Sequence, residues 1–125
     1  VALKESVAAA LLIPYDTSET TVVVATRCEF ANSKYGAVVH GSLSSATFNN
    51  CVFHDNKYYG IFGWGSTIHL HGKATAIHSN ENSGIYAYKS AKVAIHLPSH
   101  HNTSYNNGNE DRKTLMGGTI TNVED

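Results

Sequence analysis

Asn56-Lys57-Tyr58-Tyr59-Gly60-Ile61-Phe62 is followed 24 residues later by Asn80-Glu81-Asn82-Ser83-Gly84-Ile85-Tyr86, so an Asn-x-x-x-Gly-Ile-aromatic unit recurs. Four glycines keep the same step: Gly36, Gly60, Gly84 and Gly108. An internal period of this length is typical of repeat proteins, in which each unit packs on the next. The spacing therefore predicts a chain built of 24-residue units.

Further matches fall in the same register. Three serines are also 24 residues apart: Ser42, Ser66 and Ser90. Cys28 matches Cys51 at a step of 23, which indicates one shorter unit. Leu11-Leu12-Ile13 stands where Ala37-Val38-Val39 stands one unit later, so a fainter copy precedes the others.

Each unit contains short runs of alternating or β-branched residues, broken by Asn, Gly and Ser. The runs cover residues 21–25, 37–40, 61–64, 67–71, 85–88 and 92–97. Because no run carries the apolar stripe of a helical repeat, short strands are indicated. Strands that turn once per unit form the coils of a β-solenoid, whose successive coils stack as parallel strands about 4.8 Å apart.

We therefore predict one all-β domain over residues 1–125, a parallel β-helix (solenoid) with about five 24-residue coils. The coils are expected within residues 7–108, and 109–125 are expected to form a terminal turn and strand that could act as a cap. Exposed end coils invite pairing with other strands. We expect another chain, or another part of a longer protein, to cover at least one end.

The Asn-x-x-x-Gly-Ile-aromatic units at 56–62 and 80–86 resemble those of right-handed parallel β-helix domains of the pectate-lyase-like superfamily. The resemblance covers most of the chain, from about Val7 to Gly108, and implies a right-handed parallel β-helix. That superfamily contains polysaccharide lyases, hydrolases and epimerases together with non-catalytic surface proteins. The resemblance therefore implies a fold without selecting an activity.

Because side chains alternate along a strand, residues one unit apart form ladders up the solenoid. Two ladders of small or aliphatic residues are expected to face inward: Ala37, Ile61 and Ile85, and Val39, Gly63 and Ala87. A band of rings is then expected to face outward: His40, Phe62, Trp64, Tyr86 and Tyr88. Exposed aromatic patches mark interaction surfaces. We expect this band to bind a polysaccharide or a protein neighbour.

Two further ladders complete the expected coil. Phe30, Phe53 and Ile77 are expected to fill the core, and Asn56 and Asn80, with Asn32 on the shorter coil, to stack their amides at a turn. One alternative stays open, because a phase shift of one residue would move the rings of the outward band into the core.

Catalysis finds little support in the sequence. The acidic residues do not recur in a ladder and form no pair across a groove: Asp16, Glu29, Asp55, Glu81, Glu110 and Asp111. Four lysines do not converge on them in the predicted register: Lys34, Lys57, Lys89 and Lys92. We predict no catalytic residue, and a non-catalytic binding or scaffolding module. A fragment of a polysaccharide lyase, hydrolase or epimerase, or an accessory subunit of a larger assembly, is the alternative.

Histidine is frequent, with eight residues in the chain. His69 and His71 share one face of a predicted strand, and His54 is expected to stack on His78. Two imidazoles two residues apart can hold a metal only with a third and usually a fourth ligand. Since the sequence places no such ligand, we predict no metal site and no cofactor.

Cys28 and Cys51 are expected to lie about 5 Å apart on adjacent coils. That separation allows either a disulfide or a pair of buried thiols. Asn102-Thr103-Ser104 is a glycosylation acceptor sequence, which has meaning only on a secretory route.

The net charge of −1 argues against nucleic acid as a partner. No apolar run is long enough to predict a membrane span. The sequence leaves the localisation open.

Overall fold

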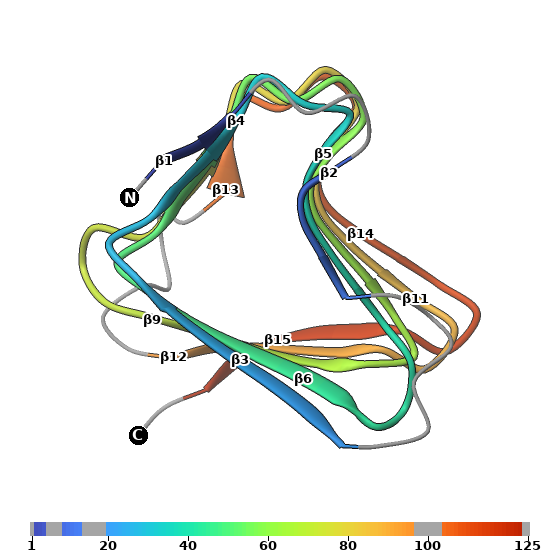
Figure 1. Cartoon of the computed structure of the whole chain (residues 1–125). Helices are drawn as coiled ribbons and strands as arrows, with labels where there is room; N and C mark the ends of the chain where they lie inside the picture. The colour runs from blue at the N-terminus through green and yellow to red at the C-terminus, as the bar shows by residue number, and fades with distance from the viewer. Residues whose placement is uncertain (1, 5–8, 14–19, 97–103, 124–125) are drawn as a thin grey trace.

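The computed structural model describes residues 2–4, 9–13, 20–96 and 104–123 of the chain, and these form strands and turns without a helix. The strands assemble into three parallel sheets of five strands each (Figure 1). Sheet A contains β1 (Ala2–Lys4), β4 (Glu29–Ala31), β7 (Val52–His54), β10 (Ala76–His78) and β13 (Ser104–Tyr105). Sheet B contains β2 (Ala9–Ile13), β5 (Tyr35–His40), β8 (Tyr59–Trp64), β11 (Ser83–Tyr88) and β14 (Glu110–Leu115). Sheet C contains β3 (Thr21–Thr26), β6 (Ser44–Asn49), β9 (Thr67–His71), β12 (Lys92–His96) and β15 (Thr119–Val123).

The chain visits the three sheets in turn, one strand each, and winds through about four full turns with a triangular outline (Figure 1). The predicted all-β parallel solenoid is therefore confirmed. The coil length is less regular than predicted. Partners are 24 residues apart where Tyr59 of β8 pairs with Tyr35 and Ser83, but 22 apart for Ser45 and Thr67 and 27 apart for Ile77 and Ser104.

The irregular steps correct two parts of the predicted repeat. Ser83 pairs with Glu110, so Gly108 does not continue the glycine ladder but lies in the last turn, where its N–H donates to the carbonyl of Asn80. Ser66 lies in line with Ser44 rather than Ser42, because the neighbouring residues Ser45 and Thr67 are the partners. Turns of different length absorb the extra residues and leave the strands stacked.

The end of the chain also differs from the prediction. Residues 110–115, expected as part of a terminal turn, form β14 and pair with β11 in sheet B. The expected last strand is β15, which pairs with β12 in sheet C. Both strands thus continue the sheets as a regular coil.

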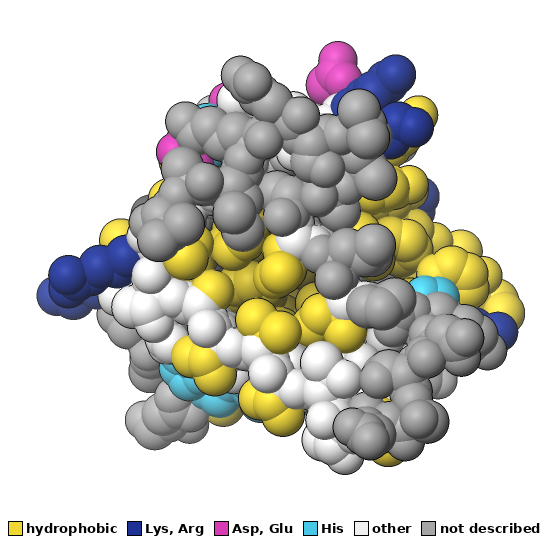
Figure 2. All heavy atoms as spheres, viewed as in Figure 1, with side chains coloured by type: hydrophobic (Ala, Val, Ile, Leu, Met, Phe, Trp, Pro, Cys, Tyr) yellow, Lys and Arg dark blue, Asp and Glu magenta, His cyan; other side chains and the backbone are white. Residues whose placement is uncertain are grey.

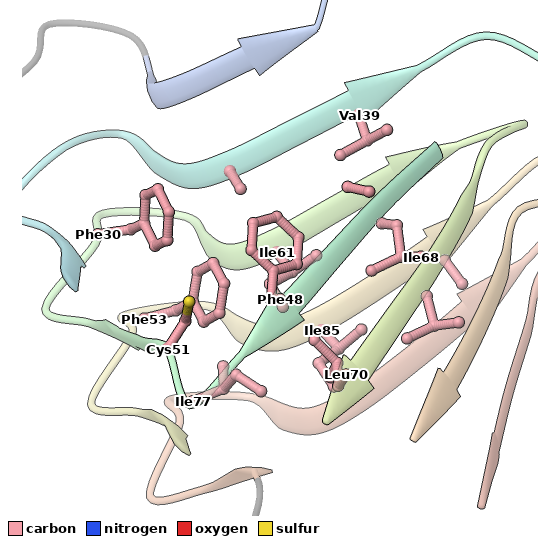
Figure 3. Packing of buried hydrophobic residues seen from close by; sticks show 14 of the residues in the cluster. Phe30, Val39, Phe48, Cys51, Phe53, Ile61, Ile68, Leu70, Ile77 and Ile85 are labelled. Carbon is pink, nitrogen blue, oxygen red and sulfur yellow. The ribbon is translucent and has the colours of Figure 1, made fainter. Parts of the chain in front are cut away.

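The core lies between the three sheets and has the predicted phase (Figure 3). The inward ladders from sheet B are fully buried, and Leu11-Leu12-Ile13 pairs with Ala37-Val38-Val39 as expected. Phe30 and Phe53 stack with ring centroids 4.8 Å apart, and the Phe48 ring packs edge-on against both. Burial of each such side chain contributes about 1.5–3 kcal/mol. The alternative phase, with the outward rings in the core, is excluded.

Gly60 shows why glycine recurs before the sheet B strands. A Cβ atom at this position would lie 2.6 Å from Ile77 Cγ2 and 2.8 Å from both Asn80 Nδ2 and the Gly84 carbonyl oxygen. No side chain fits there, because successive coils and the buried amides of the turn approach the backbone closely.

A buried ladder of amides connects the turns between sheets A and B. Asn56 Oδ1 accepts the Ser33 N–H, and Asn56 Nδ2 donates to the Phe30 carbonyl and to Asn80 Oδ1. Asn80 repeats this arrangement with Asn107 on the next coil. Asn56 and Asn80 thus lie at the turn as predicted. Asn32 does not join them, because it precedes the ladder position, which Ser33 occupies, and is exposed.

Asn32 instead belongs to a second ladder with left-handed backbone. Its members have φ between 53° and 57°: Asn32, Asp55, Ser79 and Asn106. Asn and Asp tolerate this conformation better than most residues, so the turn keeps its shape in each coil.

We expect Asn56→Ala to lower the free energy of unfolding by about 2–4 kcal/mol, because it leaves the buried Ser33 N–H and Phe30 carbonyl without their partner. Chemical denaturation of the purified chain measures this loss. Asn109→Ala is the matched control, since it removes an exposed amide that donates to Asn82 Oδ1 and should cost less than about 1 kcal/mol. Equal stabilities of the two variants would contradict a structural role for the ladder.

Candidate functional site

The outer surface of sheet B carries the predicted rings. His40 ends β5, Phe62 and Trp64 lie on β8, and Tyr86 and Tyr88 lie on β11, each offset by one residue from the buried positions. Figure 2 shows hydrophobic side chains gathered on the flank of the molecule where these strands run. The rings point outward as expected, although Tyr86 is only 8% exposed because its neighbours cover it.

Three tyrosines extend this group beyond the prediction. Tyr35 lies 5.7 Å from Tyr59 and 6.0 Å from Phe62 between ring centroids, and Tyr58 lies 5.5 Å from Tyr35. The recurrence of Tyr before Gly36 and Gly60 is the sequence signal that could have found two of them. We call the complete group the aromatic face: Tyr35, His40, Tyr58, Tyr59, Phe62, Trp64, Tyr86 and Tyr88.

The rings of the aromatic face adopt two orientations. His40 stacks on Trp64 at 4.2 Å and 18°, and Phe62 stacks on Tyr86 at 5.1 Å and 14°. These rings cover one another's faces along the solenoid. Tyr88 is turned by 79° to Trp64, and Tyr59 by 74° to Tyr86, so these two rings stand out of the stacks.

Burial sets the charge state of several of these rings. It raises the pKa of Tyr59, with a further contribution from Tyr35, and raises the pKa of Tyr86 despite the opposing charge of Lys113. Burial and the nearby Lys89 lower the pKa of His40. At neutral pH the two phenols therefore keep their protons as hydrogen-bond donors, and His40 is neutral against Trp64.

Two open pockets lie at the ends of the aromatic face. One of about 530 Å³ lies at the turns between sheets A and B, and Lys57 beside it places its Nζ 5.7 Å from the centre of the Tyr58 ring. Its lining residues are Asn32, Ser33, Lys34, Asp55, Lys57, Ser79 and Glu81. The second, of about 350 Å³, lies at the turns between sheets B and C and is lined by His40, Gly41, Ser42, Trp64, Gly65, Lys89 and Ser90.

The larger pocket corrects the expectation that lysines and acids do not converge. Lys34 and Lys57 line it together with Asp55 and Glu81. The reason is that the turns between sheets A and B stack in register, which brings position-matched charges from three coils to one place. Lys113 also approaches the aromatic face, 4.8 Å above the Tyr86 ring, because β14 pairs at a step of 27 that the 24-residue period hid.

A comparison with family models matches residues 10–122 to the right-handed β-helix region family. The chain belongs to this family. No curated protein and no solved structure matches it. The described residues contain no helix long and apolar enough to span a membrane.

Sheet C of this β-helix carries three histidines on its outer surface. The sequence analysis paired His69 with His71 and found no third ligand, and so predicted no metal site. The structure adds His96 from β12, whose Nε2 lies 3.0 Å from His69 Nδ1. Burial, together with His96, lowers the pKa of His69.

Sheet A carries a second histidine group. His54 Nε2 contacts Glu29 Oε2 at 2.5 Å, and its Nδ1 contacts the Asp55 carboxylate. Its ring stacks on His78 at 5.2 Å, as predicted, and His78 stacks in turn on Tyr105 at 5.2 Å. Burial opposes protonation of His54, but the two carboxylates outweigh it and raise its pKa. Burial and the neighbouring His54 lower the pKa of His78.

The two cysteines of the β-helix lie at matching positions of adjacent coils, where the Val52 N–H donates to the Cys28 carbonyl. Both are free thiols in the structure. The Cys51 thiol is fully buried and points to the Ala25 and Asn49 carbonyls at 3.4 and 3.5 Å, and burial raises its pKa. Asn102, the predicted glycosylation residue, lies outside the described residues.

We expect His54→Gln to lower the melting temperature more at about pH 5.5 than at about pH 8. Folding raises the pKa of His54, so protonation stabilises the fold below the ordinary pKa of about 6.5, and this contribution is lost as the pH rises through the folded-state pKa. Thermal unfolding followed by circular dichroism at the two pH values measures the difference.

His78→Gln is the control of opposite sign. Folding lowers the pKa of His78, so its protonation opposes folding, and this variant should gain stability relative to the wild type as the pH falls. The same pH dependence in both variants would show that the carboxylates around His54 do not control its charge.

Proposed function

We propose that this β-helix is a non-catalytic binding module whose aromatic face contacts a polysaccharide. The observation that carries the proposal is the continuous set of ring contacts over three coils on the outer surface of sheet B, from Tyr35 on β5 to Tyr88 on β11. An exposed apolar patch of this extent on a solenoid flank is typical of an interaction surface.

The residue types on this face favour a sugar. Tyrosine combines an apolar ring with a hydroxyl, which suits a ligand that has apolar ring faces and many hydroxyl groups. Tyr59 and Tyr88 are turned out of the stacks, so their faces are not covered by the partner ring. The pockets at both ends of the face supply charged and amide groups, among them Lys34, Asp55 and Lys89.

One observation favours a protein neighbour as the second candidate. Phe62 and Tyr86, and His40 and Trp64, cover each other's faces and so offer mainly ring edges to a ligand. Ring edges pack well against side chains of another protein surface, whereas a sugar stacks on ring faces. The two candidates therefore differ in which rings a ligand contacts.

We expect titration with one class in a panel of neutral and acidic polysaccharides to change the emission of Trp64, the single Trp of the chain, in a saturable way. Tyr88→Ala should weaken binding about tenfold, because an aromatic contact contributes about 1–1.5 kcal/mol. Tyr105→Ala is the matched control, since Tyr105 lies on β13 of sheet A, away from the aromatic face.

Either of two results would contradict the polysaccharide proposal. One is an emission spectrum that no polysaccharide changes, together with dimers or larger species whose assembly Tyr88→Ala abolishes, which would assign the face to a protein neighbour. The other is equal weakening by Tyr88→Ala and Tyr105→Ala, which would place binding elsewhere.

The larger pocket is the observation that favours the other alternative, a fragment of a polysaccharide-active enzyme. Asp55, Glu81 and two lysines lie beside the aromatic face, as an acid–base site would require. Incubation with each polysaccharide, followed by assays for new reducing ends and for unsaturated products, tests this. Product formed by the wild type and lost in Asp55→Asn would replace the non-catalytic proposal.

A further inference from the structure

Three imidazoles meet on the outer surface of sheet C, on a different side of the solenoid from the aromatic face. His69 and His71 are two residues apart on β9 and so lie on the same side of the strand. His96 is the last residue of β12 and follows Ile95, which pairs with Leu70, so it lies beside His71. One nitrogen atom from each of the three rings can be chosen so that all lie within 4.8 Å of one another.

Neighbouring residues leave room for this convergence. Ala94 is the partner of His69 on β12, and its methyl group does not fill the space above the His69 ring. His96 leans across it, and its Nε2 reaches to 3.0 Å from His69 Nδ1. The His96 ring also stacks on His71 at 4.1 Å and 10°. All three side chains are half-buried, so their rings can turn without disturbing the core.

We propose that His69, His71 and His96 form a binding site for Zn²⁺. Three histidine nitrogens are a ligand set that zinc takes in proteins, with a fourth position open to water. A zinc ion about 2.0–2.1 Å from each nitrogen sets tetrahedral neighbours about 3.3 Å apart. The 3.0 Å pair is already close to that spacing, and the His71 and His96 rings tilt apart to complete it.

The chemistry of the group selects the class of cation. Imidazole suits zinc and other late first-row metals, whereas calcium and magnesium require oxygen ligands. The group contains no carboxylate. On the other side of β9, the partners of His69 and His71 are Thr47 and Asn49, which are uncharged. The ion would join two consecutive coils, since β9 and β12 belong to successive turns of the solenoid.

Isothermal titration of the chelator-treated chain with ZnCl₂ in a buffer without phosphate tests the proposal. We expect one Zn²⁺ per chain, and affinity at least tenfold weaker in His69→Ala and in His96→Ala, because even a residue that only supports a metal ligand is worth about 10- to 100-fold. A rise in melting temperature with added Zn²⁺ should disappear in the same variants.

Two control variants locate the ion. His78→Ala removes a stacked histidine of sheet A and should keep the affinity of the wild type. The double variant His100→Ala, His101→Ala removes the adjacent histidine pair of the sequence and should also keep it. Absence of Zn²⁺ binding in the wild type, or binding that only the double variant loses, would overturn the proposal.

A measurement on the wild type covers the case in which a substitution prevents folding. Zn²⁺ should shift the imidazole nitrogen resonances of three histidines, assigned as His69, His71 and His96, and leave His78 unchanged. Shifts confined to other histidines would overturn the site. The aromatic face has no part in this measurement, so its result is independent of the polysaccharide titration.

Discussion

The hydrogen bonds of Asn56 and Asn80 are the constraint on which the other features of this β-helix depend. Each buried amide satisfies backbone groups of the preceding coil and accepts from its counterpart or from backbone on the next. Because an unsatisfied buried amide is costly, the coils cannot slip by one residue at this corner. The adjacent glycines let the backbones approach closely enough for the amides to meet. Register at the corner then fixes which side chains stack in sheet B, where the strands begin.

The same constraint explains why some of the structure followed from the sequence. Turns between sheets A and B have nearly the same length in each coil, at residues 32–34, 55–58, 79–82 and 106–109. The strands that follow them therefore repeat at a fixed step, and the inward and outward ladders of β5, β8 and β11 could be predicted from periodicity alone. The turns from sheet C to sheet A vary much more, from 50–51 to 72–75. A period counted from the glycines does not describe sheet C.

What the sequence analysis missed lies where that variation acts. His96 meets His69 and His71 because β12 pairs with β9 at a step of 25, which the glycine spacing did not indicate. Lys113 reaches Tyr86 through a step of 27. Gly108 was assigned to the ladder by numerical coincidence, although the last coil is longer. In each case the local residues were readable, and the number of residues in an irregular turn decided which of them became neighbours.

Separate ladders also allow the three outer surfaces to differ in chemistry. The core requires small and aliphatic residues at inward positions, but outward positions contribute little to packing and can change without loss of the fold. Sheet B uses them for rings, sheet C for a cluster of imidazoles, and sheet A for a histidine held by two carboxylates. These groups lie on different sides of the same solenoid and share no residue. A ligand of the aromatic face and an ion on sheet C could therefore bind at the same time, and any coupling between them would have to pass through the coil register that Asn56 and Asn80 maintain.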